Sequence, residues 1–553
     1  MYDLNLLSEH FPFEEFRPGQ RECIESILEA FDKGKRFVLL EAPTGSGKSA
    51  IGLTVAKYFE DAYYLTIQKI LQDQLANEFE NDKIKCLKGR NAYRCNYWET
   101  YMEKYMSDPA KMKQMEVDAK DPEIHKTMAN PHLPASAGVC MVKERRSKSD
   151  LCFPKGSSDL KSSLCDYWKA VGHSMSSHTC IMNFHSFLYQ TSVTDRFKPR
   201  KMLIIDEAHN SEPQLMDFVS LTLTDRALRK EGVKIPEFDT AEEYAKYFTD
   251  IRLPEKIEDM VRLAHVTRDF KKAEEWKKVL LQYKIFLNNF ESGDWIPNWE
   301  DRGYYRRVTL KPIYVNKHAQ SYLFGFGEKV LMMSATVLQP KIIYDSLGID
   351  PKEAFAYRMK NRFPAENRPI YFQPAGSMAY RNKRETMPKL LDSIESICAN
   401  YSDKKGIIHT HNFEISKYII QNGSKALKKR IFFQENYFSK EEMLKKHAKS
   451  EDGIIVAPAM HEGLDLKDDL SRFQIICKVP YPSFQDNEQL KIRMQLSQDY
   501  YNWLTALKIV QSYGRSIRST EDWADTYILD EDFSRFKRNC MKLLPKWFLE
   551  VIQ

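Results

Sequence analysis

Short apolar runs alternate along the chain with segments of helical period, which is typical of a parallel sheet covered by helices. Each run is four to eight residues long and reads as a buried strand. The runs begin at Arg36, Lys201, Val330, Lys405, Asp452 and Gln474. Three begin before residue 360 and three after it. We therefore expect an α/β fold with two parallel-sheet domains.

A long stretch between the second and third runs has a different pattern. From about Asn210 to Phe326, much of the chain has apolar residues at helical spacing and charged residues on the opposite face. The clearest part runs from residue 256 to residue 290. This pattern predicts a mainly helical insertion within the first sheet domain.

Composition narrows the class of protein. The chain has 553 residues, 42% hydrophobic and 29% charged, which is enough for several cores and several domains. No apolar run approaches the roughly 18 residues that cross a bilayer, and the first residues lack the positive charge of a signal peptide. We expect a soluble, cytoplasmic protein with no membrane partner. The net charge of +6 permits nucleic-acid binding without requiring it.

A glycine-rich loop follows the first apolar run. Ala42 to Ser49 reads APTGSGKS and leads into the helical segment IGLTVAKYF. Glycines let the backbone amides turn toward a triphosphate at a helix N-terminus, the lysine reaches the outer phosphates, and the serine offers a ligand to Mg²⁺. The candidate ATP-binding residues are Thr44, Gly45, Ser46, Gly47, Lys48 and Ser49.

Two adjacent carboxylates follow the second apolar run. Asp206 and Glu207 begin a DEAH tetrad at the carboxyl end of a predicted strand, where open α/β sheets bind their ligands. Asp206 fits the role of a Mg²⁺ ligand, and Glu207 fits that of the residue that orients or deprotonates water. His209 is a candidate for coupling the nucleotide state to neighbouring elements.

With these motifs in order, the chain resembles the superfamily 2 helicases, and specifically the XPD/DinG family of iron-sulfur DNA helicases. The sequence FRPGQ, ending at Gln20, is similar to the adenine-reading segment of the family, and VLMMSAT from Val330 is similar to its SAT motif. HEGLDL matches the EGxD block through Gly463 and Asp465. The resemblance covers residues from about 16 to 536 and implies two RecA-like motor domains. The short length is typical of a compact, viral member, which would work in the host cytoplasm.

The last block of the resemblance is QSYGRSIRS, from Gln511 to Ser519. Arg515 and Arg518 are three residues apart, so on a helix they would share one face and could both contact phosphate oxygens. The resemblance makes Arg518 the arginine finger, with Gln511 and Arg515 beside it. Catalysis then requires two domains to close around ATP.

Four of the ten cysteines gather in one segment of the first domain. Thiolates suit an iron-sulfur cluster and zinc equally well, and the unequal spacings match no simple zinc ribbon. Zinc, a domain without a cluster and four unrelated buried thiols are the alternatives. The resemblance favours a [4Fe-4S] cluster, and we expect Cys86 and Cys180 to be packing residues. The expected ligands are Cys95, Cys140, Cys152 and Cys165.

The motif positions give six segments. Residues 1–87, 171–209 and 327–360 are expected to form the first motor, and 361–553 the second. Residues 88–170 are the expected cluster domain and 210–326 the expected arch-like domain.

The resemblance implies an ATP-dependent DNA helicase or translocase that travels 5′ to 3′ on single-stranded DNA and unwinds forks as a monomer. One alternative is an ATP-dependent remodeller of protein-nucleic-acid complexes or R-loops. Another is a DNA-binding regulator of low turnover that is switched by ATP and the cluster. DNA-stimulated ATP hydrolysis separates the motor from the regulator.

Overall fold

The computed structural model describes most of the chain outside the segment 95–158. The described residues are 7–67, 69–94, 159–163, 165–194, 196–229, 232–266, 270–290, 293–301, 303, 305–437, 439–458, 466, 468–484, 487–517 and 519–553. Two parallel sheets and one antiparallel sheet organise them. Of the helices in these ranges, none is long and apolar enough to cross a membrane.

Domain 1 is built on a seven-stranded parallel sheet in the order β10-β1-β9-β5-β2-β4-β3. The strands are β1 Phe37–Glu41, β2 Ala62–Thr66, β3 Ile84–Leu87, β4 Thr179–Asn183, β5 Arg200–Asp206, β9 Gly327–Ser334 and β10 Ala354–Arg358. The helices are α1 Leu7–His10, α2 Gln20–Asp32, α3 Lys48–Phe59, α4 Lys69–Phe79, α9 Asp166–Ser176, α10 Phe184–Ser192, α11 Ser211–Val219, α16 Asn316–Tyr322 and α17 Pro340–Leu347.

Domain 2 is built on a six-stranded parallel sheet in the order β11-β16-β15-β12-β14-β13. The strands are β11 Ile370–Gly376, β12 Gly406–His409, β13 Ile431–Phe433, β14 Ile454–Ala457, β15 Phe473–Ile476 and β16 Asp525–Asp530. The helices are α18 Lys383–Asn400, α19 Phe413–Asn422, α20 Lys425–Arg430, α21 Lys440–Lys449, α22 Glu488–Leu496, α23 Gln498–Tyr513, α24 Phe533–Cys540 and α25 Lys546–Leu549. The two predicted parallel sheets are therefore confirmed.

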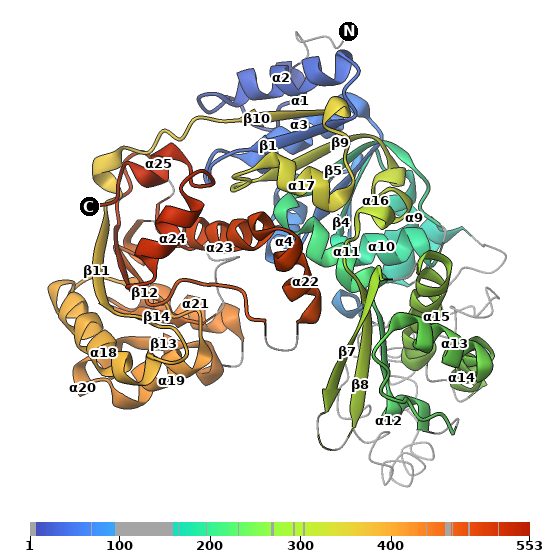
Figure 1. Ribbon diagram of the computed structural model, residues 1–553. Helices are drawn as coiled ribbons and strands as arrows, with labels where there is room; N and C mark the ends of the chain where they lie inside the picture. Colours follow the sequence, from blue (N-terminus) through green and yellow to red (C-terminus); the bar gives the residue numbers. More distant parts are fainter. Residues whose placement is uncertain are drawn as a thin grey trace, which may run out of the picture.

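The second insertion projects from domain 1 (Figure 1). Its helices are α12 Asp225–Leu228, α13 Ala241–Asp250, α14 Leu253–Val266 and α15 Phe270–Asn289, which agrees with the helical pattern. It also contains an unexpected antiparallel sheet of β6 Leu221–Thr224, β8 Arg306–Pro312 and β7 Trp295–Asp301. Pro297 lies in β7, which is an edge strand of this sheet, where proline is tolerated.

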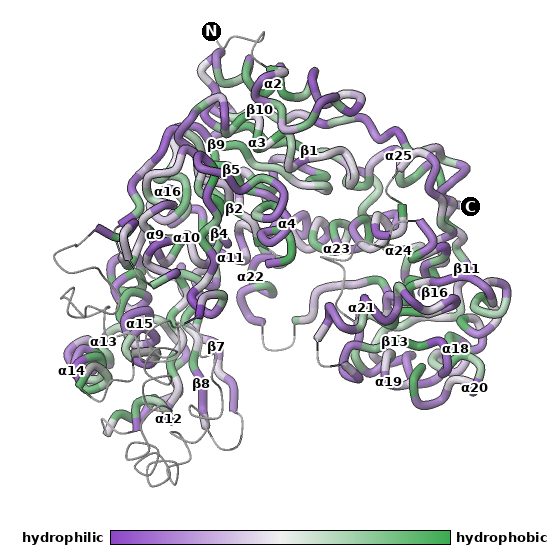
Figure 2. Tube along the Cα trace, turned by 180° about the vertical axis from the view of Figure 1, so that it is seen from behind, coloured by the Kyte–Doolittle hydropathy of each residue, from purple (hydrophilic) through white to green (hydrophobic). Residues whose placement is uncertain are grey.

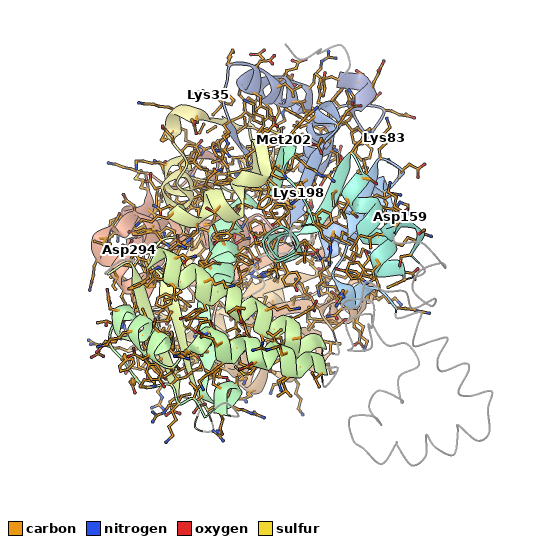
Figure 3. All side chains as sticks on the ribbon, turned by 90° about the vertical axis from the view of Figure 1, so that its right-hand side faces the viewer. Lys35, Lys83, Asp159, Lys198, Met202 and Asp294 are labelled. Atoms are coloured by element: carbon orange, nitrogen blue, oxygen red, sulfur yellow. The ribbon has the colours of Figure 1, made fainter. Side chains whose placement is uncertain are left out.

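The first insertion leaves domain 1 after β3 and returns to it before α9. Figure 3 labels Lys83, just before β3, and Asp159, where the described chain resumes, toward the same edge of the molecule, with Asp294 of the second insertion toward the other edge. Helix α9 packs against β3. The two insertions thus arise at different places on domain 1.

Hydrophobic residues concentrate in the strands of both sheets, while hydrophilic ones dominate outer helices such as α14 (Figure 2). One buried apolar cluster runs from domain 1 into domain 2. It includes Val337 and Ile343 of domain 1 together with Trp503, Ala506 and Val510 of α23. Helix α23 therefore belongs to domain 2 by its chain position and to the core of domain 1 by its packing.

The packing of β12 gives a stability prediction. A Cβ added to Gly406 would lie 2.5 Å from the ring of Phe473, and Tyr401 stacks on that ring from 4.7 Å. The ring has little freedom to move, so we expect Gly406→Ala to lower the free energy of unfolding of domain 2 by about 1–3 kcal/mol. Urea unfolding measures this loss.

Gly89→Ala is the matched control. No atom lies within 4 Å of the added Cβ, and Gly89 has φ −63° and ψ 154°, which any residue adopts. Equal urea midpoints for the two variants would contradict the prediction.

Candidate nucleotide-binding site

The phosphate-binding loop lies between β1 and α3, as the sequence predicts. Gly45 has φ 81°, and Gly47, the N-cap of α3, has φ 78° and ψ 42°, so both need the left-handed region that glycine tolerates. Thr44, Lys48 and Ser49 are half-buried around this turn. The loop therefore presents the N-terminus of a twelve-residue helix, which favours anions.

Two side chains of the loop fit a phosphate ligand. The Oγ of Ser46 is buried and has no hydrogen-bond partner among the described residues. The Nζ of Lys48 lies 3.5 Å from the carbonyl oxygen of Ala42, a long contact that leaves the ammonium able to bind another acceptor. A triphosphate supplies the acceptors that both groups need.

Gln20, the first residue of α2, holds this loop in place through hydrogen bonds. Its Nε2 donates to the carbonyl oxygen of Ser46 at 2.8 Å, and its Oε1 accepts from the amide of Arg17 at 2.7 Å. A Cβ on Gly47 would lie 2.2 Å from the same Nε2. Gln20 is 1% exposed, so its observed role is to hold the loop. Its contact with adenine stays a prediction.

The acidic pair lies at the end of β5, beside the loop. Asp206 is buried, and burial followed by the charge of Glu207 raises the pKa of its carboxyl to about 6, although Lys48 acts in the opposite direction. The hydroxyl of Tyr64 lies 3.4 Å from Oδ2 of Asp206 and also contacts Ser49. The two candidate Mg²⁺ ligands, Ser49 and Asp206, are thus joined by one hydroxyl group, an oxygen-rich setting that fits the ion.

Glu207 has a strained backbone. Its φ is 51° and ψ is 47°, in the left-handed region that a glutamate rarely adopts. Its amide donates to Oδ1 of Asp206 at 2.9 Å, which holds the turn. The side chain is 27% exposed and is therefore available to water, unlike that of Asp206.

His209 connects three parts of the molecule. Its Nδ1 lies 2.7 Å from Oγ of Ser334 at the end of β9, and its Nε2 lies 2.7 Å from Nε2 of Gln511 in domain 2. Asn210 also points its amide nitrogen at Nε2, from 2.9 Å. The direction of each of these hydrogen bonds depends on which ring nitrogen carries the proton. Ser334 in turn donates to the carbonyl oxygen of Thr336 at 2.9 Å.

The arginine motif differs from its prediction. Helix α23 ends at Tyr513, and the amide of the following Gly514 donates to the carbonyl oxygen of Val510. Arg515 therefore lies beyond the helix, so the expectation that it shares a helical face with Arg518 is wrong. Gly514 is the C-cap of α23, with φ −77° and ψ 23°. Arg518, Gly463 and Asp465 lie outside the described residues.

Sequence reasoning missed two participants in this site. Tyr64 lies in an apolar strand with nothing in its pattern to distinguish it from a core residue. Trp503 of α23 donates from Nε1 to the carbonyl oxygen of Val337 at 2.9 Å, just past the SAT motif. Only the contact between the two domains reveals that role.

The structure describes Cys165 but not the other expected cluster ligands. Cys165 is buried at the N-cap of α9, whereas Cys95, Cys140 and Cys152 lie outside the described residues. No group of three or more candidate metal ligands occurs in the part of the chain that the structure describes. Cys86 and Cys180 are buried as expected, and burial raises the pKa of their thiols to about 12 and about 11. The cluster stays a prediction.

Comparisons with known proteins agree with this geometry. Residues 394–551 match the helicase C-terminal domain family, and residues 13–227 match the family described as type III restriction enzyme, res subunit. A segment of 115 residues is 31% identical to the ATP-dependent DNA helicase CHL1 of Candida albicans, and one of 112 residues is 28% identical to chl1 of Schizosaccharomyces pombe. Each segment covers 18% of this chain and spans only 13% of the relative's length.

Two solved structures share the fold over nearly the whole chain. An XPD helicase has a TM-score of 0.59 at 15% identity, with 96% of this chain and 99% of that chain covered. Xpd4 from S. tokodaii has a TM-score of 0.53 at 13% identity, with 97% and 99% covered. The chain therefore contains a segment of the helicase C-terminal domain family and a segment of the type III restriction enzyme res subunit family, one in each sheet domain. Its overall fold is similar to that of the XPD helicases.

The raised pKa of Asp206 predicts a pH-dependent effect on stability. The pKa of the Asp206 carboxyl is near its ordinary value of 3.8 in the unfolded chain and about 6 in the folded chain. Burying the ionised carboxylate therefore destabilises the folded chain at pH values above about 6. In EDTA and without nucleotide, we expect Asp206→Asn to be more stable than wild type by about 1–3 kcal/mol at pH 8, with no gain below about pH 4. Urea unfolding across pH measures it.

Asp82→Asn is the control, because the side chain of Asp82 is fully exposed. It should show no gain at either pH. A stability gain of Asp206→Asn that is the same at pH 4 and pH 8 would contradict the assigned burial of the charge.

Proposed function

We propose that the protein is an ATP-driven motor that moves on single-stranded DNA and unwinds duplexes. The observation that carries this proposal is the position of His209. Its Nδ1 lies 3.5 Å from Oε2 of Glu207 in the acidic pair, and the same ring contacts Ser334 at the start of the SAT segment and Gln511 of domain 2. A change in the nucleotide would therefore alter the contact between the two domains, and a motor requires such coupling between hydrolysis and domain movement.

In this proposal, domain 1 supplies most of the hydrolysis chemistry. The amides of the loop and Lys48 bind the outer phosphates, and Glu207 orients the attacking water. Ser49 and Asp206 are the residues that would hold Mg²⁺, an ion that neutralises phosphate charge when bound. Domain 2 contributes Gln511 through His209, together with Arg515 and Arg518 from the segment after α23.

The DNA assignment rests on the family. The relatives from Candida albicans and Schizosaccharomyces pombe are named as ATP-dependent DNA helicases, and each shares one segment with this chain. We propose that this chain also acts on DNA and that it moves along single-stranded DNA from 5′ to 3′. Its proposed duplex substrate is forked DNA. Gly463 and Asp465 are proposed to act beside the nucleotide from domain 2.

We also propose that the first insertion holds a [4Fe-4S] cluster through Cys95, Cys140, Cys152 and Cys165. Four thiolates match the donor set of such a cluster. The cluster would cross-link the insertion and would take no part in hydrolysis, because phosphoryl transfer needs no electron transfer. Cys165 precedes α9, which packs on β3, so the insertion would be fixed to the edge of domain 1.

ATP hydrolysis with and without single-stranded DNA tests the motor. We expect DNA to stimulate hydrolysis and Lys48→Ala to lower kcat/KM by about a hundredfold or more, since one preorganised donor to the transition state contributes that much. Lys57→Ala is the matched control, because Lys57 is the same residue type at the far end of α3.

Two results would contradict the motor. Hydrolysis that DNA does not stimulate would favour the regulator of low turnover. Stimulated hydrolysis without strand separation on forks carrying a 5′ or a 3′ tail would favour a remodeller that displaces bound proteins. Unwinding only of forks with a 3′ tail would reverse the proposed direction and leave the motor in place.

Cys165→Ser tests the cluster separately. After anaerobic purification, wild type should carry about four iron atoms and four sulfides per chain, and the variant close to none. Its affinity for ATP should stay within about twofold, while unwinding falls, because the loop and the insertion lie at different places on domain 1. Cys95→Ser should behave in the same way.

Cys180→Ser is the control, because Cys180 is buried in β4 as a packing residue. It should keep its iron. Zinc without iron in wild type, or full iron in Cys165→Ser, would contradict the cluster assignment and leave the motor untouched.

A further inference from the structure

A buried ion pair joins the two domains next to the acidic motif. Arg493 of α22 donates from Nη1 to Oε1 of Glu212 in α11 at 2.5 Å, and the hydroxyl of Tyr500 donates to the other carboxylate oxygen. Glu212 is 7% exposed and Arg493 is 4% exposed. The guanidinium carbon lies 3.5 Å from the ring centroid of Tyr500 and 4.8 Å from that of Tyr314 in domain 1.

Such a pair defines how the domains fit together. Removing two charges from water is costly, and the cost is offset only when the partners meet in good geometry. Domain 1 supplies the carboxylate and one ring, and domain 2 supplies the guanidinium and the other ring. A small shift of either domain would leave a buried charge without its partner, so this contact permits few relative positions.

The pair lies on the same chain segment as the acidic motif. Glu207 ends the turn after β5, a short 3₁₀ turn follows from Ala208 to Asn210, and α11 then begins at Ser211. Glu212 is in the first turn of that helix, where a negative charge is favourable. The anchor of domain 2 and the catalytic carboxylates therefore share one short, continuous stretch of backbone.

Helix α23 connects the contact at Glu212 to the candidate nucleotide-binding site. Tyr500, Trp503 and Gln511 lie within about 80° of one another around the helix axis, at 3.6 residues per turn. Each contacts domain 1: Tyr500 at Glu212, Trp503 at Val337 and Gln511 at His209. The helix rises by about 16 Å between Tyr500 and Gln511. The three contacts form one row along a single rigid element.

We propose that Glu212 is a positioning residue for ATP hydrolysis. With Arg493 and Tyr500, it pins the N-terminal end of α23 to domain 1, so that Gln511 at the other end reaches His209. Glu212 acts through α23 and touches neither the loop nor the acidic pair. This proposal rests on the proposed ATP hydrolysis, whose rate reports the placement of Gln511.

The competing explanation is that the pair only stabilises the folded chain. Both explanations predict a loss of stability when Glu212 is neutralised, so stability alone does not separate them. They differ in how Glu212 and Gln511 combine. If Glu212 acts by placing Gln511, its effect on kcat disappears once Gln511 has no side chain, whereas independent effects multiply.

The test is a double-mutant cycle of Glu212→Gln and Gln511→Ala, with kcat and KM for ATP measured on saturating single-stranded DNA. We expect each single variant to lower kcat by about tenfold and to leave KM within about twofold. The double variant should be no slower than Gln511→Ala alone. Tyr500→Phe keeps the ion pair and should show the same non-additivity with a loss of about threefold, which covers the case that Glu212→Gln does not fold.

Asp522→Asn is the matched control. Asp522 is buried and pairs with Arg472 at 2.7 Å entirely within domain 2. Its effect on kcat, if any, should multiply with that of Gln511→Ala. Multiplying effects in the Glu212 and Tyr500 cycles, or the same non-additivity in the Asp522 cycle, would overturn the positioning role while wild-type hydrolysis stands. A wild type without hydrolysis would overturn the proposed function, and the positioning role with it.

Discussion

The docking of α23 onto the carboxyl edge of the first sheet is the contact on which the arrangement of the site depends. Parallel strands bring the ends of β1, β5 and β9 to one edge, so the phosphate loop, the acidic pair and the SAT segment meet there. The second domain reaches that edge through α23, and Arg493 of the preceding helix α22 pairs with Glu212 beside it. Because Trp503 and Val510 of α23 lie in the same apolar cluster as Val337, the helix is held by burial as well as by hydrogen bonds.

A second set of contacts ties the strands of domain 1 together at this edge. Glu41 ends β1, and its Oε1 accepts from the amides of Val337 and Leu338, which follow the SAT segment. Arg358 of β10 pairs with its other carboxylate oxygen. Val337 thus bonds to Glu41 through its amide and to Trp503 through its carbonyl group. The strand that leads into the phosphate loop and the helix from domain 2 are separated by a single residue.

The sequence was sufficient for the features that depend on neighbouring residues. Periodicity located the strands that precede Ala42 and end at Asp206, and glycines identified the loop between β1 and α3. It failed at the arginine motif, because α23 ends at Tyr513 and leaves Arg515 beyond the helix on which it was placed. It also missed the antiparallel sheet β6-β8-β7 within the insertion that was expected to be mainly helical. The Glu212–Arg493 pair has no local signature at all, because its partners are brought together only by the docking of the domains.

The two ends of the α23 contact differ in what it costs to separate them. At the Gln511 end, the link to His209 is a single hydrogen bond that involves no carboxylate, and such a bond has a net contribution of about 1 kcal/mol. At the other end, separating Arg493 from Glu212 leaves buried charges unpaired, which costs about 3–5 kcal/mol. Of these two polar contacts, the one at Gln511 therefore breaks at the lower cost in free energy. A rotation of α23 about the Glu212 end would displace Gln511 more than Tyr500 or Trp503, because Gln511 lies farther from that pivot.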